Sequence, residues 1–167
     1  MRFAGLLAIT WLCSSSCAPA SPKTVEGSSS SPNHWAECYR GFSSTGDPKS
    51  DLVRLTRACG HLGGMRPISP IRVAHQAATA KSHHYAIPVV GSQCLRIFAT
   101  ADADIVDLDL LLRHTDGEAV AADLTHDSFP VLPPRAPLCL DEPGPYVLEV
   151  SVHRGAGYYA VQVWGKS

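Results

Sequence analysis

The stretch of sequence from Ile105 to Arg113 reads Ile-Val-Asp-Leu-Asp-Leu-Leu-Leu-Arg, and its alternation decides the fold class. In an extended strand, successive side chains point to opposite faces, so apolar residues at every second position predict one buried face. The predicted buried face carries Val106, Leu108, Leu110 and Leu112. The opposite, wet face carries Asp107, Asp109 and Arg113. We therefore expect a small all-β domain with this strand near its centre.

Shorter segments of the same kind lie on both sides of this stretch. They predict strands over residues 84–90, 94–100, 119–123, 138–140, 146–153 and 158–164. Pro88 indicates an edge strand or a break in the strand, and Asp116-Gly117 is a strong hairpin signal. Thirteen Gly and thirteen Pro in 167 residues suit many turns, and residues 130–137 are expected to be a Pro-rich loop. Seven or eight short strands at this spacing predict an antiparallel β-sandwich over residues 73–167.

Residues 33–72 predict a helical prelude followed by a connector. Asn33 can cap a first short helix, and Asp47-Pro48 has the signature of a second helix start. Leu52, Leu55 and Cys59 then recur at helical spacing and give one apolar stripe. From residue 61 to 71 the Gly and Pro content predicts a connector, so that strands are expected only from about residue 83.

The N-terminal residues predict export. Arg2 precedes an apolar run over residues 3–12, followed by small residues, which is typical of a signal peptide over 1–20. Cleavage after Ala20 would release the protein, whereas a lipoprotein signal over 1–16 would leave Cys17 lipidated as the first residue. The Ser/Pro-rich residues 17–32 are expected to be a disordered tether, which favours lipidation. The expected location is the bacterial cell envelope, at the outer membrane or in the periplasm, or alternatively the secreted fraction.

Four cysteines remain in the part of the chain expected to fold. They are Cys38, Cys59, Cys94 and Cys139. An exported protein meets an oxidising environment, so disulfides are expected. Three pairings are possible, and spacing alone does not choose among them. We favour one bond within the helical prelude, between the first two, and one across the sandwich, between the last two. The absence of a Cys-x-x-Cys motif argues against a zinc site.

Charge and acidic residues limit the possible ligands. Fourteen Lys+Arg stand against fifteen Asp+Glu, with no basic block, so no nucleic-acid partner is expected. Asp107 and Asp109 share a strand face, and Asp123 on the next strand could converge with them, as could Asp116. Such oxygen ligands would suit calcium. The favoured alternative is that these carboxylates are the solvated face of the strand, with no metal or other cofactor bound.

No catalytic motif is present. The sequence contains neither Gly-x-Ser-x-Gly nor His-Glu-x-x-His, and the adjacent His83 and His84 would point to opposite faces of a strand. The aromatic residues Trp35, Tyr158, Tyr159 and Trp164 could form a glycan-stacking surface, although core or edge positions are more common for such residues. We therefore predict no catalytic residues and no enzyme.

Three segments resemble the bacterial pre-peptidase C-terminal domain family. They are residues 106–110 (Val-Asp-Leu-Asp-Leu) with Asp116-Gly117, residues 143–150 (Pro-Gly-Pro-Tyr-Val-Leu-Glu-Val) and residues 159–163 (Tyr-Ala-Val-Gln-Val). The resemblance covers about half of the chain, from about His84 to Trp164. It implies a small jelly-roll β-sandwich of the kind attached to secreted enzymes and found in envelope proteins, and it supplies no catalytic residues. The layout also resembles exported lipoproteins of Gram-negative bacteria.

These observations together predict a mainly β, jelly-roll-like sandwich with a short disulfide-linked helical prelude. The expected function is that of a non-enzymatic exported envelope protein that binds or supports other molecules. Its expected partner is an envelope or extracellular protein or glycan, with membrane contact only through a lipid anchor. The alternative is a calcium-stabilised carbohydrate- or protein-binding accessory domain, and a hydrolase is disfavoured.

Overall fold

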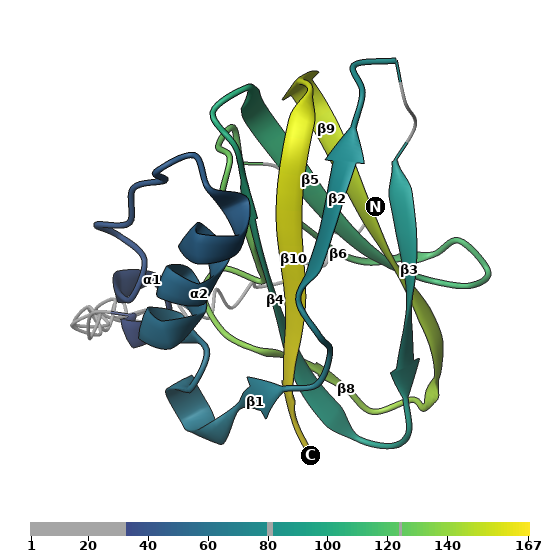
Figure 1. Ribbon diagram of the computed structural model, residues 1–167. Coiled ribbons are helices and arrows are strands. Elements are labelled where there is room, and N and C mark those ends of the chain that lie inside the picture. The colour runs from purple at the N-terminus through teal and green to yellow at the C-terminus, as the bar shows by residue number, and fades with distance from the viewer. Residues whose placement is uncertain (1–32, 80–81, 124) are drawn as a thin grey trace, which may run out of the picture. The chain divides into compact units, whose positions relative to one another are not determined.

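The computed structural model describes residues 33–79, 82–123 and 125–167. The predicted signal, the lipidation of Cys17 and the tether lie outside the described residues. Within these ranges the chain forms one compact unit (Figure 1). Its elements are α1 (His34–Glu37), α2 (Pro48–Cys59), the 3₁₀ helix η1 (Leu62–Gly64), β1 (Arg66–Pro67), β2 (Arg72–Gln76), β3 (His83–Val89), β4 (Gln93–Ala101), β5 (Ile105–His114), β6 (Ala119–Asp123), β7 (Val131–Leu132), β8 (Leu138–Leu140), β9 (Gly144–Gly155) and β10 (Gly157–Lys166). None of the helices within these ranges has the length and apolar character needed to cross a membrane.

The strands form two antiparallel sheets with the strand order of a jelly roll. One sheet has the order β2-β10-β4-β8, with the two-residue strands β1 and β7 added beside β10 and β4. The other sheet has the order β3-β9-β5-β6. If the eight longer strands are lettered B to I along the chain, these orders are B-I-D-G and C-H-E-F, the double Greek key of a jelly roll. The predicted β-sandwich is confirmed.

Chain connections follow from this order. Between consecutive longer strands, the chain crosses from one sheet to the other at every step except the β5–β6 hairpin. That hairpin turns at Asp116-Gly117, as predicted, and Gly117 has a φ of 97°. Glycine favours this left-handed conformation because it has no Cβ to clash with the backbone.

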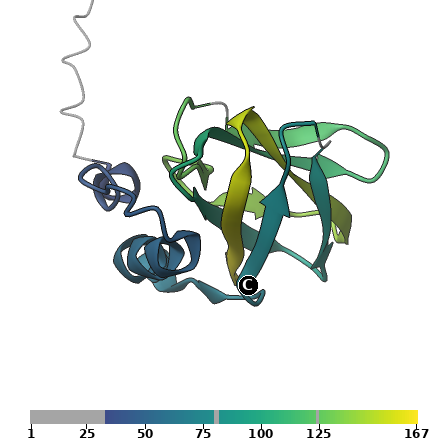
Figure 2. The same cartoon turned by 45° about the horizontal axis from the view of Figure 1, so that its top comes forward.

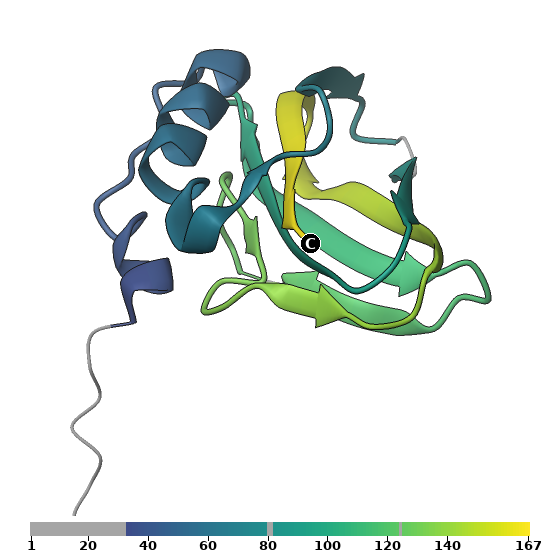
Figure 3. The ribbon, with the colours of Figure 1, turned by 90° about the horizontal axis from the view of Figure 1, so that it is seen from below.

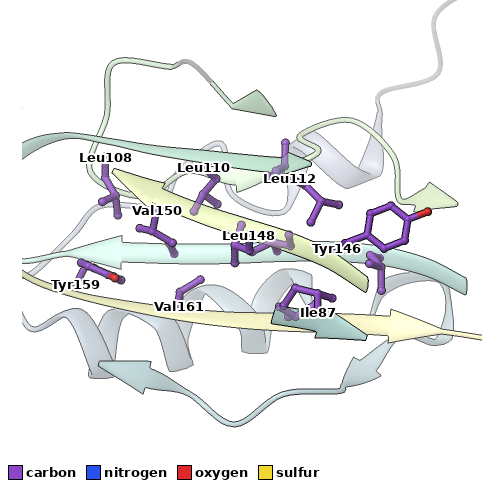
Figure 4. Packing of buried hydrophobic residues seen from close by; sticks show 14 of the residues in the cluster. Ile87, Leu108, Leu110, Leu112, Tyr146, Leu148, Val150, Tyr159 and Val161 are labelled. Atoms are coloured by element: carbon purple, nitrogen blue, oxygen red, sulfur yellow. The ribbon is translucent and has the colours of Figure 1, made fainter. Parts of the chain in front are cut away.

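The sandwich core fills the space between the two sheets. Figure 4 shows side chains from β3, β5, β9 and β10 pointing toward one another. The labelled residues are Ile87, Leu108, Leu110, Leu112, Tyr146, Leu148, Val150, Tyr159 and Val161, and all are buried. Burying each large apolar side chain contributes about 1.5–3 kcal/mol relative to exposure, so this cluster is the main source of stability.

The beginning of β5 departs from the predicted alternation. The register between β5 and β9 leaves Val106 and His153 without partners, so each strand carries one extra residue there. Such a β-bulge reverses the faces of the residues that precede it. As a result Ile105 enters the core, Val106 is 47% exposed, and the predicted burial of Val106 is wrong. The predicted alternation holds from Leu108 onward.

The helical prelude forms a third layer. Figure 2 and Figure 3 show the helices on one side of the sandwich, beside the sheet that contains β4 and β10. Helix α2 starts as predicted, because the Asp47 carboxylate accepts a hydrogen bond from the backbone N–H of Ser50 at 3.0 Å. Its apolar stripe packs on β4 and β10 and forms a second core. That core contains Leu52, Leu55, Cys59, Met65, Phe98, Val131, Ala160 and Trp164.

Strand β4 is buried on both faces because it lies between the two cores. Its second face carries Arg96, which is fully buried. The guanidinium donates hydrogen bonds to the carbonyl of Trp35 at 2.8 Å and to the carbonyls of Pro133 and Pro134 at 3.3 and 3.2 Å. Burial lowers the pKa of Arg96 to about 10, which leaves it charged at neutral pH. Arg96 therefore holds α1 and the loop after β7 against the sheet.

Three short strands were not predicted. The expectation that no strand precedes residue 83 is wrong, because β1 and β2 both pair with β10. The predicted loop over residues 130–137 contains β7, which pairs with β4 at Ile97 and Phe98. Strands β1 and β7 have only two residues each, too few to show alternation, and β2 comes directly after the segment that contains Pro67 and Pro70.

Two disulfides join cysteines of the described residues. Cys38 is bonded to Cys59 and ties the segment after α1 to the end of α2. Cys94 is bonded to Cys139, and the two residues lie directly opposite each other on the adjacent strands β4 and β8. The expectation that this second bond crosses the sandwich is therefore wrong, because it lies within one sheet.

Candidate functional site

A cleft of about 400 Å³ opens along one side of the sandwich, between β2 and β3. These are edge strands of different sheets, and they run beside each other in Figure 1. The cleft is lined by Ile68, Ser69, Pro70, Arg72, Tyr85, Ala86, Ile87, Pro88, Val90, Gln93, Leu148, Val161 and Val163. Ligand pockets in proteins measure about 300–1,000 Å³ and are mostly apolar with a few polar groups. The cleft has this size and composition.

The floor of the cleft is the sandwich core itself. Ile87, Leu148 and Val161 are 5%, 1% and 2% exposed and belong to the core cluster between the sheets. The rim is apolar as well, and its side chains are exposed: Ile68 is 40% exposed and Val90 is 95% exposed. An apolar molecule in the cleft would cover this rim and gain the free energy of burying it.

A chain of hydrogen bonds joins β3 to β10 at one end of the cleft. The Tyr159 hydroxyl of β10 lies 2.6 Å from the Tyr85 hydroxyl of β3 and 2.6 Å from Nδ1 of His83. Tyr159 is fully buried, and burial, together with the hydrogen bond to Tyr85, raises the pKa of Tyr159 above its ordinary value. The neutral phenol therefore persists at physiological pH, and these three side chains join the two sheets.

Arg72 lies at the boundary between this closed part and the cleft. It is opposite Val161 on β10, whose side chain faces the core, so the Arg72 side chain also starts on the inner face of β2. Its guanidinium lies 5.3 Å from the centre of the Tyr85 ring, a cation–π distance. Arg72 is the one charged residue in the lining of the cleft within the described chain. Gln93 adds a buried Oε1 that makes no hydrogen bond with the described residues.

The carboxylates considered as an alternative calcium site lie on two sides of their sheet. Asp123 is opposite Leu110, so its side chain is on the core side, whereas Asp107 and Asp109 flank Leu108 on the outer side. Asp107 and Asp123 are each 3% exposed. The expectation that these carboxylates form a solvated face is therefore wrong for both residues. No group of three His, Cys, Asp or Glu side chains in residues 33–79, 82–123 and 125–167 is placed to hold one metal ion.

The surroundings of the acidic residues differ, and those of Asp109 and Asp123 raise their pKa values. Asp107 is covered by the loop after β6, and its Oδ2 lies 3.2 Å from Nδ1 of His126. Burial and the nearby charge of Asp107 raise the pKa of Asp109. Burial raises the pKa of Asp123 to about 6, despite a hydrogen bond from the Thr125 hydroxyl at 3.1 Å.

The four aromatic residues considered as a glycan surface do not share an exposed face. Tyr159 and Trp164 are 0% and 4% exposed and belong to different cores, one on each side of the same sheet. Trp35 packs against the second core, under the Arg96 guanidinium. Tyr158 alone of the four is largely exposed, at 54%.

The residues of the cleft were not predicted from the sequence. Arg72 and Ile68 fall in the segment interpreted as a connector, and Tyr85 and Ile87 were assigned to a strand without a function. The available signal was the run Ile71-Arg72-Val73-Ala74 after Pro70, whose β-branched residues favour a strand. Its position opposite β3 follows only from the strand order of the complete jelly roll.

Comparison with known proteins gives structural matches only. No family model matches the chain, and no curated protein sequence matches it. The pre-peptidase C-terminal domain of collagenase from Bacillus anthracis is similar to this chain, at 16% identity over 56% of this chain and 87% of that chain, with a TM-score of 0.47. The structure of the Gt strain of infectious bursal disease virus is similar over 60% of this chain and 30% of that chain, at 10% identity and a TM-score of 0.32.

Proposed function

We propose that this protein is a non-enzymatic, exported binding module of the bacterial cell envelope that holds an apolar ligand in the cleft between β2 and β3. The observation that carries the proposal is the apolar cleft between these two edge strands, whose floor is the sandwich core. The floor residues Ile87, Leu148 and Val161 are themselves buried, whereas Ile68 and Val90 on the rim are exposed. Here β2 and the segment before it stand far enough from β3 to leave about 400 Å³ beside those side chains.

The lining favours binding over chemistry. Aliphatic side chains and prolines dominate it, and its polar members are Ser69, Arg72, Tyr85 and Gln93. An arginine stays protonated at all physiological pH values, so Arg72 can hold a charge but does not act as a proton acceptor. A cleft of this composition can orient an apolar molecule through a few polar contacts.

Export is supported by the two disulfides. Disulfides form and persist in oxidising compartments such as the periplasm and the cell exterior. The bonds Cys38–Cys59 and Cys94–Cys139 are compatible with such a location. Together with the apolar run and small residues near the N-terminus, they support placement in the cell envelope.

The test is a titration of the mature protein with N-phenyl-1-naphthylamine, a neutral dye that fluoresces in apolar surroundings. We expect saturable enhancement by the wild-type protein and its loss in Ile68→Asp, which places a charge on the rim. Val53→Asp on α2 is the matched control, because Val53 is 38% exposed and Ile68 is 40% exposed. Equal signals from the two variants, or no signal from the wild type, would refute the proposal.

A further inference from the structure

We infer that the ligand is a single-chain amphiphile, a linear alkyl chain ending in a carboxylate, with its chain in the cleft and its carboxylate on Arg72. This inference rests on the proposed function, because it names the class of ligand for the same cleft. Three features of the site support it. Arg72 makes no ion pair with the described residues, the apolar lining is long, and no second cationic side chain lines the described cleft.

Arg72 is available to an anionic ligand. The ion pairs of the described residues involve Arg40, Arg54, Arg113, His84 and His126, and none involves Arg72. Its guanidinium is instead placed over the Tyr85 ring, which leaves its N–H donors free of carboxylate partners among the described residues. A guanidinium fork matches the two oxygens of a carboxylate, and the resulting hydrogen bonds are charge-assisted.

The contact with the Tyr85 ring places the Arg72 guanidinium at one end of the cleft. An arginine on an edge strand commonly lays its aliphatic stem over apolar surface and keeps its head in water. Here the neighbouring surface is the mouth of a cleft, and the head group stands at one end of it rather than over a closed core. A ligand that fills the cleft would bring its own end group to the guanidinium.

The cleft is elongated along the strands. On the β3 side its lining runs from Tyr85 to Val90, and on the opposite side from Arg72 back to Ile68. Five residue steps of extended chain span roughly 16 Å at ~3.3 Å per residue. An extended alkyl chain follows such a path, with its charged end at Arg72 and its methyl end toward Val90 and Gln93.

The charge of the lining fixes the charge of the head group. Arg72 supplies one positive charge, and no second cationic side chain lines the described cleft. A carboxylate carries one negative charge at neutral pH and would be matched by it. A cationic head group would be repelled, and a neutral alcohol would lose the charge-assisted contact.

The experiment displaces N-phenyl-1-naphthylamine from the mature protein with three monomeric probes of equal chain length. The probes are dodecanoate, dodecanol and dodecyltrimethylammonium, each below its micelle concentration. We expect dodecanoate to displace the dye at about fivefold lower concentration than dodecanol, the range of a partly exposed ion pair. Dodecyltrimethylammonium should be the weakest of the three. The preference for dodecanoate should shrink as salt is added.

Three variants test whether Arg72 causes the preference for dodecanoate. Arg72→Gln should bind dodecanoate and dodecanol equally, and Arg72→Lys should keep part of the preference because it keeps the charge. Arg66→Gln removes the same charge from the exposed strand β1, outside the cleft, and should behave as the wild type. Both positions are on the surface, so folding should be retained, which thermal unfolding would verify.

Outcomes separate this inference from the proposed function. Dye binding without a preference for dodecanoate, or a preference that survives Arg72→Gln, overturns the inference and leaves the apolar cleft intact. The absence of dye binding overturns both. Sedimentation with vesicles of dioleoyl phosphatidylglycerol, without displacement by monomeric dodecanoate, would also overturn it, because the protein would then recognise a bilayer surface rather than a single chain.

Discussion

The hydroxyl oxygens of Tyr85 and Tyr159 lie 2.6 Å apart and join the two sheets of the sandwich at the end of the cleft. One strand, β3, therefore has two environments along its length. Near His83 it is fixed to the opposite sheet by hydrogen bonds, and from Ile87 onward it borders an open apolar cleft. The fixed part holds the seam in register while the open part remains available to a ligand.

The hydrogen-bonded tyrosines should contribute measurably to stability. Tyr159→Phe removes the shared hydroxyl and leaves the Tyr85 hydroxyl and Nδ1 of His83 without this partner. His83 and Tyr85 are half-buried, and a hydrogen bond contributes about 0.5–1.5 kcal/mol to stability, so urea unfolding should show a loss of that size. Tyr158→Phe, on the exposed neighbour in the same strand, should change stability by less than about 0.5 kcal/mol. Equal effects of the two substitutions would show that the hydroxyl chain contributes nothing.

The loop before α2 depends on a buried carboxylate. Asp51 is fully buried and accepts hydrogen bonds from the Ser44 and Thr45 hydroxyls and from the backbone N–H groups of Thr45 and Gly46. Burial alone would raise the pKa of Asp51, but these hydrogen bonds outweigh burial and lower it below the ordinary 3.8. The stabilisation that the ionised Asp51 carboxylate provides is therefore present above about pH 4. It is lost as the pH falls through the pKa that Asp51 has in the folded state.

Asp51→Asn should accordingly reduce the free energy of unfolding at pH 7 by about 1–3 kcal/mol, because an amide accepts fewer and weaker hydrogen bonds than a carboxylate. The difference from the wild type should narrow below pH 4. Chemical unfolding at several pH values measures both effects, with the exposed Asp141→Asn as control. A difference that stays constant down to pH 3 would contradict this assignment.

Asp123 should have the opposite pH dependence. Burial raises its pKa to about 6, so the folded state favours the protonated form and ionisation costs stability. Through this ionisation, the free energy of unfolding of the wild-type protein should fall by about 2–3 kcal/mol as the pH rises from 4 to 6. Asp123 should cause no further loss above that range. Asp123→Asn should remove this step, whereas the exposed Asp104→Asn should retain it. A ¹³C titration of the carboxyl carbon that gives a pKa near 4 would contradict the prediction.

The two disulfides should stabilise the protein to different degrees. The bonded residues are 21 positions apart in Cys38–Cys59 and 45 positions apart in Cys94–Cys139. The chain-entropy model gives about 3 kcal/mol for the first bond and about 4 kcal/mol for the second. Replacing each pair with alanine and measuring urea unfolding tests this order. A larger loss from the first pair would show that the prelude contributes more to stability than loop length predicts.

Alternation in the sequence was enough to predict the longer strands and their hairpin. The strands from Cys94 to Thr100 and from Tyr146 to His153 lie close to their predicted positions, and α2 begins at its predicted cap, Asp47. These signals are local, because each depends on residues within one element. The jelly-roll order confirms the fold class that the resemblance implied, while the small strands β1 and β7 were too short to be predicted.

The features that were missed depend on contacts between distant elements. The bulge at Val106 arises from the register of β5 against β9, which no single segment contains. The burial of Asp107 depends on the loop that carries His126. The cleft depends on β2 and β3 being edge strands of opposite sheets, and Arg72 becomes a candidate ligand contact only in that arrangement.

The central claim is that an alkyl chain enters the sandwich between β2 and β3. The most direct measurement is a methyl NMR titration of the mature protein with dodecanoate, followed by intermolecular nuclear Overhauser effects from the alkyl protons. The account predicts shifts and effects at the methyl groups of Ile87, Leu148, Val161 and Val163, with none at Val53 on α2. Effects confined to other surfaces, or no saturable shift at the cleft methyl groups, would contradict it.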